Sequence, residues 1–184
     1  GLYAAIAIQA ALIKRAATGA GAHIDMALLD TQAGVLANQA MNYLVSGNTP
    51  KRMGNQHPNI VPYRVFPASD GHIIIASGND RQWQSVCEVL GIPELAADSG
   101  FATNAARIEN REELNGLLDA LTAKRTRADL LAALEKAGVP AGPINSVAAV
   151  FADPQVVHRG MIQTLPLEGR PFPAVRSPVM IDGQ

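Results

Sequence analysis

One loop carries side chains that could bind a ligand, and it reads Met53-Gly54-Asn55-Gln56-His57-Pro58-Asn59. Gly54 permits a close approach of the backbone or a positive φ angle. Asn55, Gln56 and His57 can donate hydrogen bonds to an acyl or thioester oxygen, which is the task of an oxyanion hole. The alternative is a plain connector between two domains, held by hydrogen bonds between its side chains and its own backbone. Composition alone leaves both interpretations open.

Other residues that often do chemistry are isolated in this sequence. Four histidines lie far apart, without an acidic partner at the spacing of metal ligands: His23, His57, His72 and His158. We therefore expect no metal site. Cys87 falls in the middle of a predicted helix, which favours an inert core thiol over a nucleophile. The sequence has no P-loop, no complete dinucleotide fingerprint and no G-x-S-x-G elbow.

The elements of the N-terminal part predict the end of an α/β unit over residues 1–47. Leu2–Ala17 is rich in Ala, Leu and Ile, which predicts a helix buried nearly all round. Its apolar stretch is shorter than the roughly 20 residues of a membrane span. His23–Ala27 alternates polar and apolar residues, as a short strand does, and Leu28–Val45 returns to helical spacing.

Residues 48–64 are expected to form a linker that contains the glycine-bearing loop, and residues 65–160 a small α+β domain. Asp70-Gly71, between two apolar runs, predicts a β-hairpin. Helices are predicted over 79–90, 110–124, 126–137, 146–151 and 154–159. Residues 161–184 are read as a segment that returns to the first unit, with strands over Met161–Leu167 and Val179–Ile181.

Composition and charge exclude several classes of protein. Fifteen basic and 16 acidic residues give a net charge of −1, which argues against binding to nucleic acid or to an anionic membrane surface. A hydrophobic content of 48% is typical of a globular protein. A single cysteine excludes an internal disulfide and is compatible with a reducing compartment, so we expect a cytoplasmic protein. Because Gly1 lies directly in an apolar run, we expect a piece of a longer protein.

Several long blocks of the sequence resemble the family III CoA-transferases, also called the CaiB/BaiF family. The blocks are GLYAAIAIQAALIKRAATGAGAHIDMALLD, RMGNQHPNIVPYRVFPASDGHIIIASGNDRQWQSVCEVLG, FATNAARIENREEL, KAGVPAGPINSVAAVFADPQVVHRGM and PFPAVRSPVMI. Together they extend over nearly the whole chain. The resemblance implies an α/β fold, in which this chain is the C-terminal part of a large doubly wound domain plus a small α+β domain. It also implies a homodimer of two interlocked subunits in the full-length protein.

The resemblance further implies a reaction and its site residues. In the family an aspartate attacks the acyl-CoA thioester, and a mixed anhydride and then an aspartyl-CoA thioester follow. That aspartate lies four residues before the glycine that matches Gly1, so no catalytic residue is expected within this chain. Gly54, Asn55, Gln56 and His57 match a loop that covers the nucleophile and are expected to bind substrate. The loop has less glycine than in some members, which argues against a mobile lid.

Three functions remain open at this point. The first is transfer of CoA from an acyl-CoA to a carboxylic acid, with both molecules as substrates and no permanently bound cofactor. The second is an α-methylacyl-CoA racemase or epimerase of the same family, which abstracts the proton α to the thioester. The third is a non-catalytic dimerisation or interaction module. We expect the 184-residue chain alone to be inactive.

Overall fold

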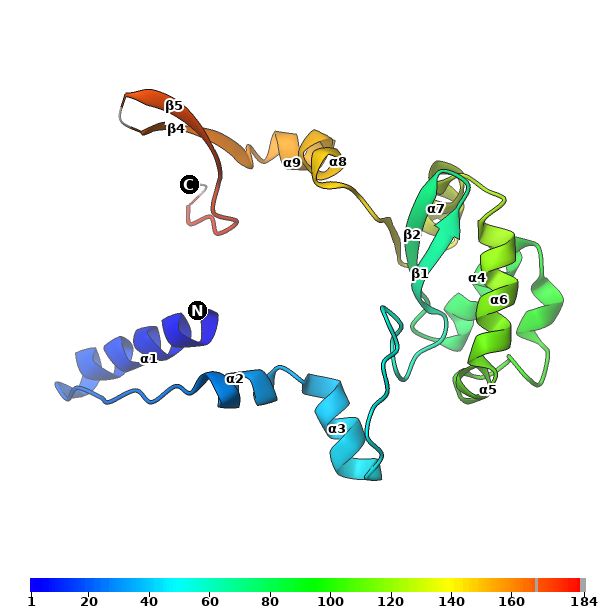
Figure 1. Cartoon of the computed structure of the whole chain (residues 1–184), viewed down its shortest axis with the longest axis horizontal. Helices are drawn as coiled ribbons and strands as arrows, with labels where there is room; N and C mark the ends of the chain where they lie inside the picture. Colours follow the sequence, from blue (N-terminus) through cyan, green and yellow to red (C-terminus); the bar gives the residue numbers. More distant parts are fainter. Residues whose placement is uncertain (168, 183–184) are drawn as a thin grey trace. The chain divides into compact units, whose positions relative to one another are not determined.

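The computed structural model describes residues 1–167 and 169–182, and the chain divides into two compact units, Gly1–Gly54 and Asn55–Gln184. Figure 1 shows the order of the elements along the chain. The first unit contains three helices: α1 (Leu2–Thr18), α2 (Leu28–Gly34) and α3 (Ala37–Ser46). Gly19 ends α1 with φ 71°, and its N–H donates to the carbonyl of Arg15.

The apolar side chains of the first unit are exposed. No residue of α1, α2 or α3 is buried, and the exposed fractions reach 83% for Leu2 and 73% for Ile13. The helix predicted over Leu2–Ala17 is confirmed as α1, but within this unit its apolar side chains are not covered, because three helices supply too little surface to bury one of them nearly all round. That these helices pack against a further segment of polypeptide stays a prediction.

Two elements expected in the first unit differ from the prediction. Residues 21–27 form no strand, since no second strand is described in this unit to pair with the alternating His23–Ala27 segment. The helix expected over Leu28–Val45 is interrupted after Gly34, and Ala37 adopts a positive φ of 46° at the start of α3. Glycine disfavours a helix interior, so the spacing of apolar residues alone overestimated the length of this helix.

The second unit begins with a three-stranded antiparallel sheet in the order β1-β2-β3. Its strands are β1 (Tyr63–Ala68), β2 (Gly71–Ala76) and β3 (Ala141–Pro143). Ala68 pairs with Gly71 across the turn, as the Asp70-Gly71 signal predicts. Gly71 has φ 146°, a conformation that other residues rarely adopt, so glycine is required there by the backbone.

Four α-helices and one 3-10 helix follow the hairpin, and most begin at a side-chain cap. They are α4 (Asp80–Leu90), η1 (Pro93–Ala96), α5 (Asn104–Glu109), α6 (Arg111–Thr122) and α7 (Arg127–Lys136). Asn79 accepts from the N–H of Gln82, and Thr126 accepts from the N–H of Asp129, which confirms both predicted helix starts. Helix α5, capped by Thr103, was not predicted.

A single core lies between the sheet and helices α4, α6 and α7 (Figure 1). Strand β2 alternates, so that Ile73 and Ile75 point inward with exposed fractions of 0%. Helix α6 contributes Leu114 and Leu118, whereas Leu117 is 43% exposed. The other large buried side chains include Val61, Phe66, Trp83, Val86, Leu130 and Leu134.

The C-terminal part contains α8 (Val147–Ala152), α9 (Pro154–His158), β4 (Ile162–Leu167) and β5 (Arg170–Val175). Strands β4 and β5 form a two-stranded antiparallel sheet. The predicted strand over Val179–Ile181 is wrong, and the second strand lies instead in the proline-rich segment before it. A strand with one neighbour has a free edge, so Pro171 and Pro173 can lack N–H groups without losing sheet bonds.

Candidate functional site

The glycine of the candidate loop is required by the backbone and not by lack of space. Gly54 adopts φ 61°, in the left-handed region. A Cβ atom added at this position would meet nothing within 4 Å. Any other residue there would be strained by its conformation alone.

Asn55 ties the loop to the first strand. Its side-chain Oδ1 accepts a hydrogen bond of 3.0 Å from the N–H of Val65 in β1. The Asn55 side chain is therefore engaged through its acceptor, which leaves its amide NH₂ as the group that can meet a ligand. The residue itself is exposed.

Gln56 has an amide whose orientation is fixed by its neighbours. Its Oε1 accepts from Nδ2 of Asn115 at 3.2 Å and from an Nη of Arg111 at 3.4 Å. Arg111 has donors only, so the oxygen of the Gln56 amide must face it. The Nε2 group, a donor of two hydrogen bonds, consequently faces away from α6.

The orientation of the His57 side chain is also fixed by its neighbours. Its Nδ1 accepts from the N–H of Asn59 at 3.1 Å, and its own backbone N–H donates to the carbonyl of Tyr63 at 2.9 Å. The imidazole stacks on the ring of Tyr63, with centroids 5.1 Å apart and planes inclined by 16°. In a neutral imidazole whose Nδ1 accepts, the proton is on Nε2. His57 therefore also presents a donor.

The loop is bound by one polar stripe of α5 and α6, formed by Asn104, Arg107, Arg111 and Asn115; the first three bind its main chain and Asn115 binds the side chain of Gln56. Arg111 donates to the carbonyls of His57 at 2.8 Å and Pro58 at 2.7 Å. Asn104 donates to the carbonyl of Asn59 at 2.9 Å and accepts from the N–H of Val61 at 3.1 Å. Partial burial lowers the pKa of the Arg111 guanidinium, and the nearby Glu112 carboxylate opposes this shift.

Arg107 holds the end of the loop from inside the core. Its side chain is 1% exposed, and its Nε donates to the carbonyl of Val61 at 2.7 Å. Its remaining donors meet the carbonyls of Phe101 at 2.8 Å and Ala102 at 3.2 Å, and a carboxylate oxygen of Asp80 at 2.7 Å. The guanidinium also lies over the ring of Trp83, 5.3 Å from its centroid. A buried charge with this many partners is a rigid support.

This stripe was not predicted from the sequence, although the sequence contains a signal for it. Its polar residues are spaced at intervals of three, four and four, which places them on one face of a helix. They are Asn104, Arg107, Arg111 and Asn115. The side chains of such a stripe need hydrogen-bond partners where they pack against the rest of the domain, and the carbonyls of a loop are suitable acceptors. The spacing alone does not identify which loop supplies them.

The other candidate residues carry no comparable arrangement. Burial raises the pKa of the Cys87 thiol to about 12, with the nearby Arg107 charge opposing and Glu94 and Glu88 adding to the shift. Cys87 is buried, so its predicted place in the core is confirmed. Among the described residues, no group of three or more His, Cys, Asp and Glu is placed to hold a metal ion. Within the same residues, no helix has both the length and the apolar character needed to cross a membrane.

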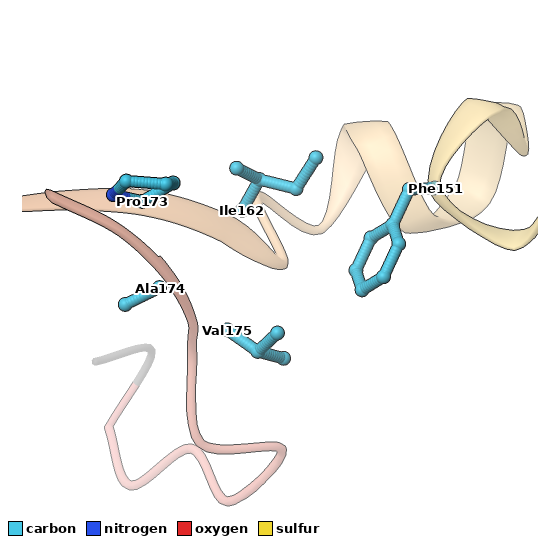
Figure 2. Close-up of a pocket in the computed structure, with 5 residues that line it drawn as sticks. All are labelled: Phe151, Ile162, Pro173, Ala174 and Val175. Atoms are coloured by element: carbon cyan, nitrogen blue, oxygen red, sulfur yellow. The ribbon is translucent and has the colours of Figure 1, made fainter. Parts of the chain in front are cut away.

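Three hollows elsewhere in the described chain are lined by side chains less suited to binding a ligand through oriented donors. Figure 2 shows an apolar hollow of about 290 Å³ between the end of α8 and strands β4 and β5, with Phe151, Ile162 and Val175 turned toward it. A second apolar hollow, of about 720 Å³, lies beside α3 within the first unit. A polar one of about 280 Å³ includes Asn79 and Gln82 at the start of α4. None of them brings together side chains with the defined donor geometry of Gln56 and His57.

Comparisons with known proteins agree with one another. A family model described as CoA-transferase family III matches residues 1–184. A succinate–glutarate CoA-transferase of Agrobacterium fabrum is 51% identical over 182 residues, which are 98% of this chain and 46% of that protein. A succinyl-CoA:glutarate CoA-transferase of Homo sapiens is 42% identical over 181 residues, which are 96% of this chain and 41% of that protein.

A solved structure supports membership of the same family. The crystal structure of a CAIB/BAIF family protein from Brucella suis is 58% identical and superposes with a TM-score of 0.74. The match covers 99% of this chain and 47% of the other. This chain therefore spans about half the length of the proteins it matches.

Proposed function

The chain belongs to CoA-transferase family III, and from this premise we propose that the whole protein transfers CoA from an acyl-CoA thioester to a free carboxylic acid. The observation that carries the proposal is the 51% identity, over nearly the whole chain, to a protein named as a succinate–glutarate CoA-transferase. We propose small dicarboxylic acids and their CoA thioesters as the substrates, since two of the relatives are named for succinate or succinyl-CoA and glutarate. CoA is then a substrate and not a bound cofactor.

The proposed reaction divides between this chain and a segment that precedes it in relatives. By the resemblance, an aspartate just before the position of Gly1 attacks the thioester carbonyl and releases CoA as a thiolate, which leaves a mixed anhydride. The thiolate attacks the aspartyl carbonyl of that anhydride and releases the acyl group as its carboxylate. The incoming carboxylate and the aspartyl-CoA thioester then repeat these steps in reverse, which returns the free aspartate and a new acyl-CoA.

Within this chain, the proposed substrate-binding residues are Gly54, Asn55, Gln56 and His57. The Nε2 groups of Gln56 and His57 are both donors, and donors suit the oxygens of carboxylates and of a thioester that gains negative charge. The support for this assignment is the fixed orientation of the two side chains. We also propose a homodimer with interlocked subunits, which rests on the family resemblance.

The proposal is tested with the protein at the length of its relatives. Succinyl-CoA and glutarate are incubated with the enzyme, and the CoA thioesters are separated by chromatography. We expect glutaryl-CoA to form and succinate to be released in equal amount. Gln56→Leu and His57→Ala should each lower kcat, since a donor to a developing oxyanion contributes on the order of 10²-fold.

Two outcomes would overturn the proposal. Incorporation of solvent deuterium α to the thioester, with no requirement for an acceptor acid, would indicate a racemase or epimerase. Absence of turnover with any tested acid, together with a stable dimer, would indicate an interaction module. The 184-residue chain by itself should give no turnover, and turnover by it would mean that the nucleophile has been misplaced.

A further inference from the structure

We propose that Arg111, together with Asn115, is a positioning residue that orients the donors of Gln56 and His57 toward the substrate. The inference rests on the proposed function, in which these two side chains bind the substrate. The three described hydrogen bonds of Arg111 all go to the loop and none goes to another part of the chain. Its role is therefore exerted through Gln56 and His57.

The contacts of Arg111 are concentrated on three consecutive residues. Its guanidinium reaches the carbonyls of His57 and Pro58 and the side-chain Oε1 of Gln56, at 2.8, 2.7 and 3.4 Å. The planar fork of a guanidinium can bind two carbonyls at once with fixed geometry, which an ammonium group cannot do. This arrangement determines both the path of the loop and the direction of the Gln56 amide.

Arg111 also differs from the other anchoring arginines in its charge balance. Arg64, Arg107 and Arg125 each form an ion pair, whereas no ion pair is described for Arg111. Its guanidinium places a positive charge behind the donors of Gln56 and His57, which the nearby Glu112 carboxylate offsets in part. A cation in this place favours a carboxylate or a developing oxyanion on the ligand side.

Loss of these contacts should affect the direction of the donors before it affects folding. The terminal torsion of a glutamine has two broad orientations that differ by a half turn, so an unbound amide can present either its oxygen or its nitrogen. A misplacement of about 1 Å in a group that contacts the reacting atoms can lower the rate about 10²-fold. We therefore expect a large kinetic effect and a small effect on stability.

The matched control is Arg125, whose guanidinium is also partly buried and binds a carbonyl. It donates to the carbonyl of Val89 at 2.7 Å and to Asp129 at 2.6 Å, and it has no described bond to the loop. Arg111→Lys and Arg125→Lys each keep a positive charge and lose the fork. They should have similar melting temperatures, so that a difference in kinetics reports position and not stability.

The experiment measures kcat and KM for CoA transfer in the full-length enzyme. We expect Arg111→Lys to lower kcat/KM by roughly 10- to 100-fold, chiefly through kcat. Arg125→Lys should stay within about threefold of wild type. In the double variant Arg111→Lys, Gln56→Leu, the loss should be little greater than with Gln56→Leu alone, because one residue acts through the other.

The results that would overturn the inference are distinct from those that would overturn the proposed function. Equal losses in Arg111→Lys and Arg125→Lys, in proportion to their melting temperatures, would show that Arg111 is only structural. Multiplicative losses in the double variant would show that it does not act through Gln56. The proposed function, in contrast, is tested on the wild-type enzyme alone. If that enzyme performs another reaction, the two variants can still be compared in that reaction.

Discussion

The replacement Arg107→Met tests how much of the stability of the small domain depends on one buried cation. Methionine has no donors and is shorter than arginine by the end of the guanidinium, so the substitution removes every hydrogen bond of that group and also leaves a small void. The carbonyls of Val61 and Phe101, both of which meet Arg107 in buried bonds, would lose these donors. Each buried carbonyl without a donor costs about 1–3 kcal/mol. We expect a loss of about 3–5 kcal/mol in the free energy of unfolding.

The ion pair with Asp80 contributes much less to this value. The Asp80 side chain is 55% exposed, so water can replace the guanidinium around its carboxylate. Asp80→Asn should therefore cost about 1 kcal/mol or less. The comparison of the two variants separates the value of the carbonyl bonds from that of the charge pair.

The assay is unfolding of the 184-residue chain in urea, followed by tryptophan fluorescence. Trp83 is the single tryptophan of this chain and lies in the core beside Arg107, so the transition reports this domain alone. Midpoints and slopes are compared, because the substitution also changes the intensity of the signal. A loss below about 1 kcal/mol for Arg107→Met would refute the reasoning, since it would mean that the carbonyls find other donors. Equal losses for both variants would assign the stability to the ion pair.

Three further predictions concern single positions in the same domain. Asn79→Ala removes the side-chain cap of α4 and should destabilise the domain by about 1 kcal/mol in urea titrations, whereas Asn79→Asp should retain most of the cap. Phe66→Ala should cost about 3–5 kcal/mol by the same titration, and a much smaller loss would contradict its complete burial. The Cys87 thiol, with its pKa raised to about 12, should resist a thiol reagent at pH 8 until the domain opens, so that labelling follows unfolding. Rapid labelling of the folded domain would show that the thiol is accessible.

Local signals in the sequence were sufficient to predict several helices and the hairpin of the small domain. Asn79 and Thr126 begin helices because their side chains bond to backbone N–H groups a few residues ahead. The hairpin indicated by Asp70-Gly71 forms, with Ser69 and Asp70 as its turn and Gly71 as the first residue of β2. The family resemblance and the α/β fold class are confirmed by the family model and the Brucella suis structure. The domain boundaries and the substrate-binding role of Gly54–His57 stay predictions.

Structural features that depend on partners distant in the sequence could not be predicted from local patterns. Whether His23–Ala27 forms a strand depends on a neighbouring strand, which local alternation cannot supply. The proline-rich segment Arg170–Val175 is a strand because its prolines lie on a sheet with a free edge. The candidate site shows the same limit, since Gln56 was recognised but Arg111, more than 50 residues later, was not.

The way in which α5 and α6 bind the loop has a consequence for divergence among related enzymes. Most of these bonds go to main-chain atoms, namely the carbonyls of residues 57, 58, 59 and 61 and the N–H of residue 61. Backbone groups are present whatever side chain is attached to them. The identity of most loop residues can therefore change through mutation without loss of the anchor, so that the side chains of the loop can diverge on an unaltered support.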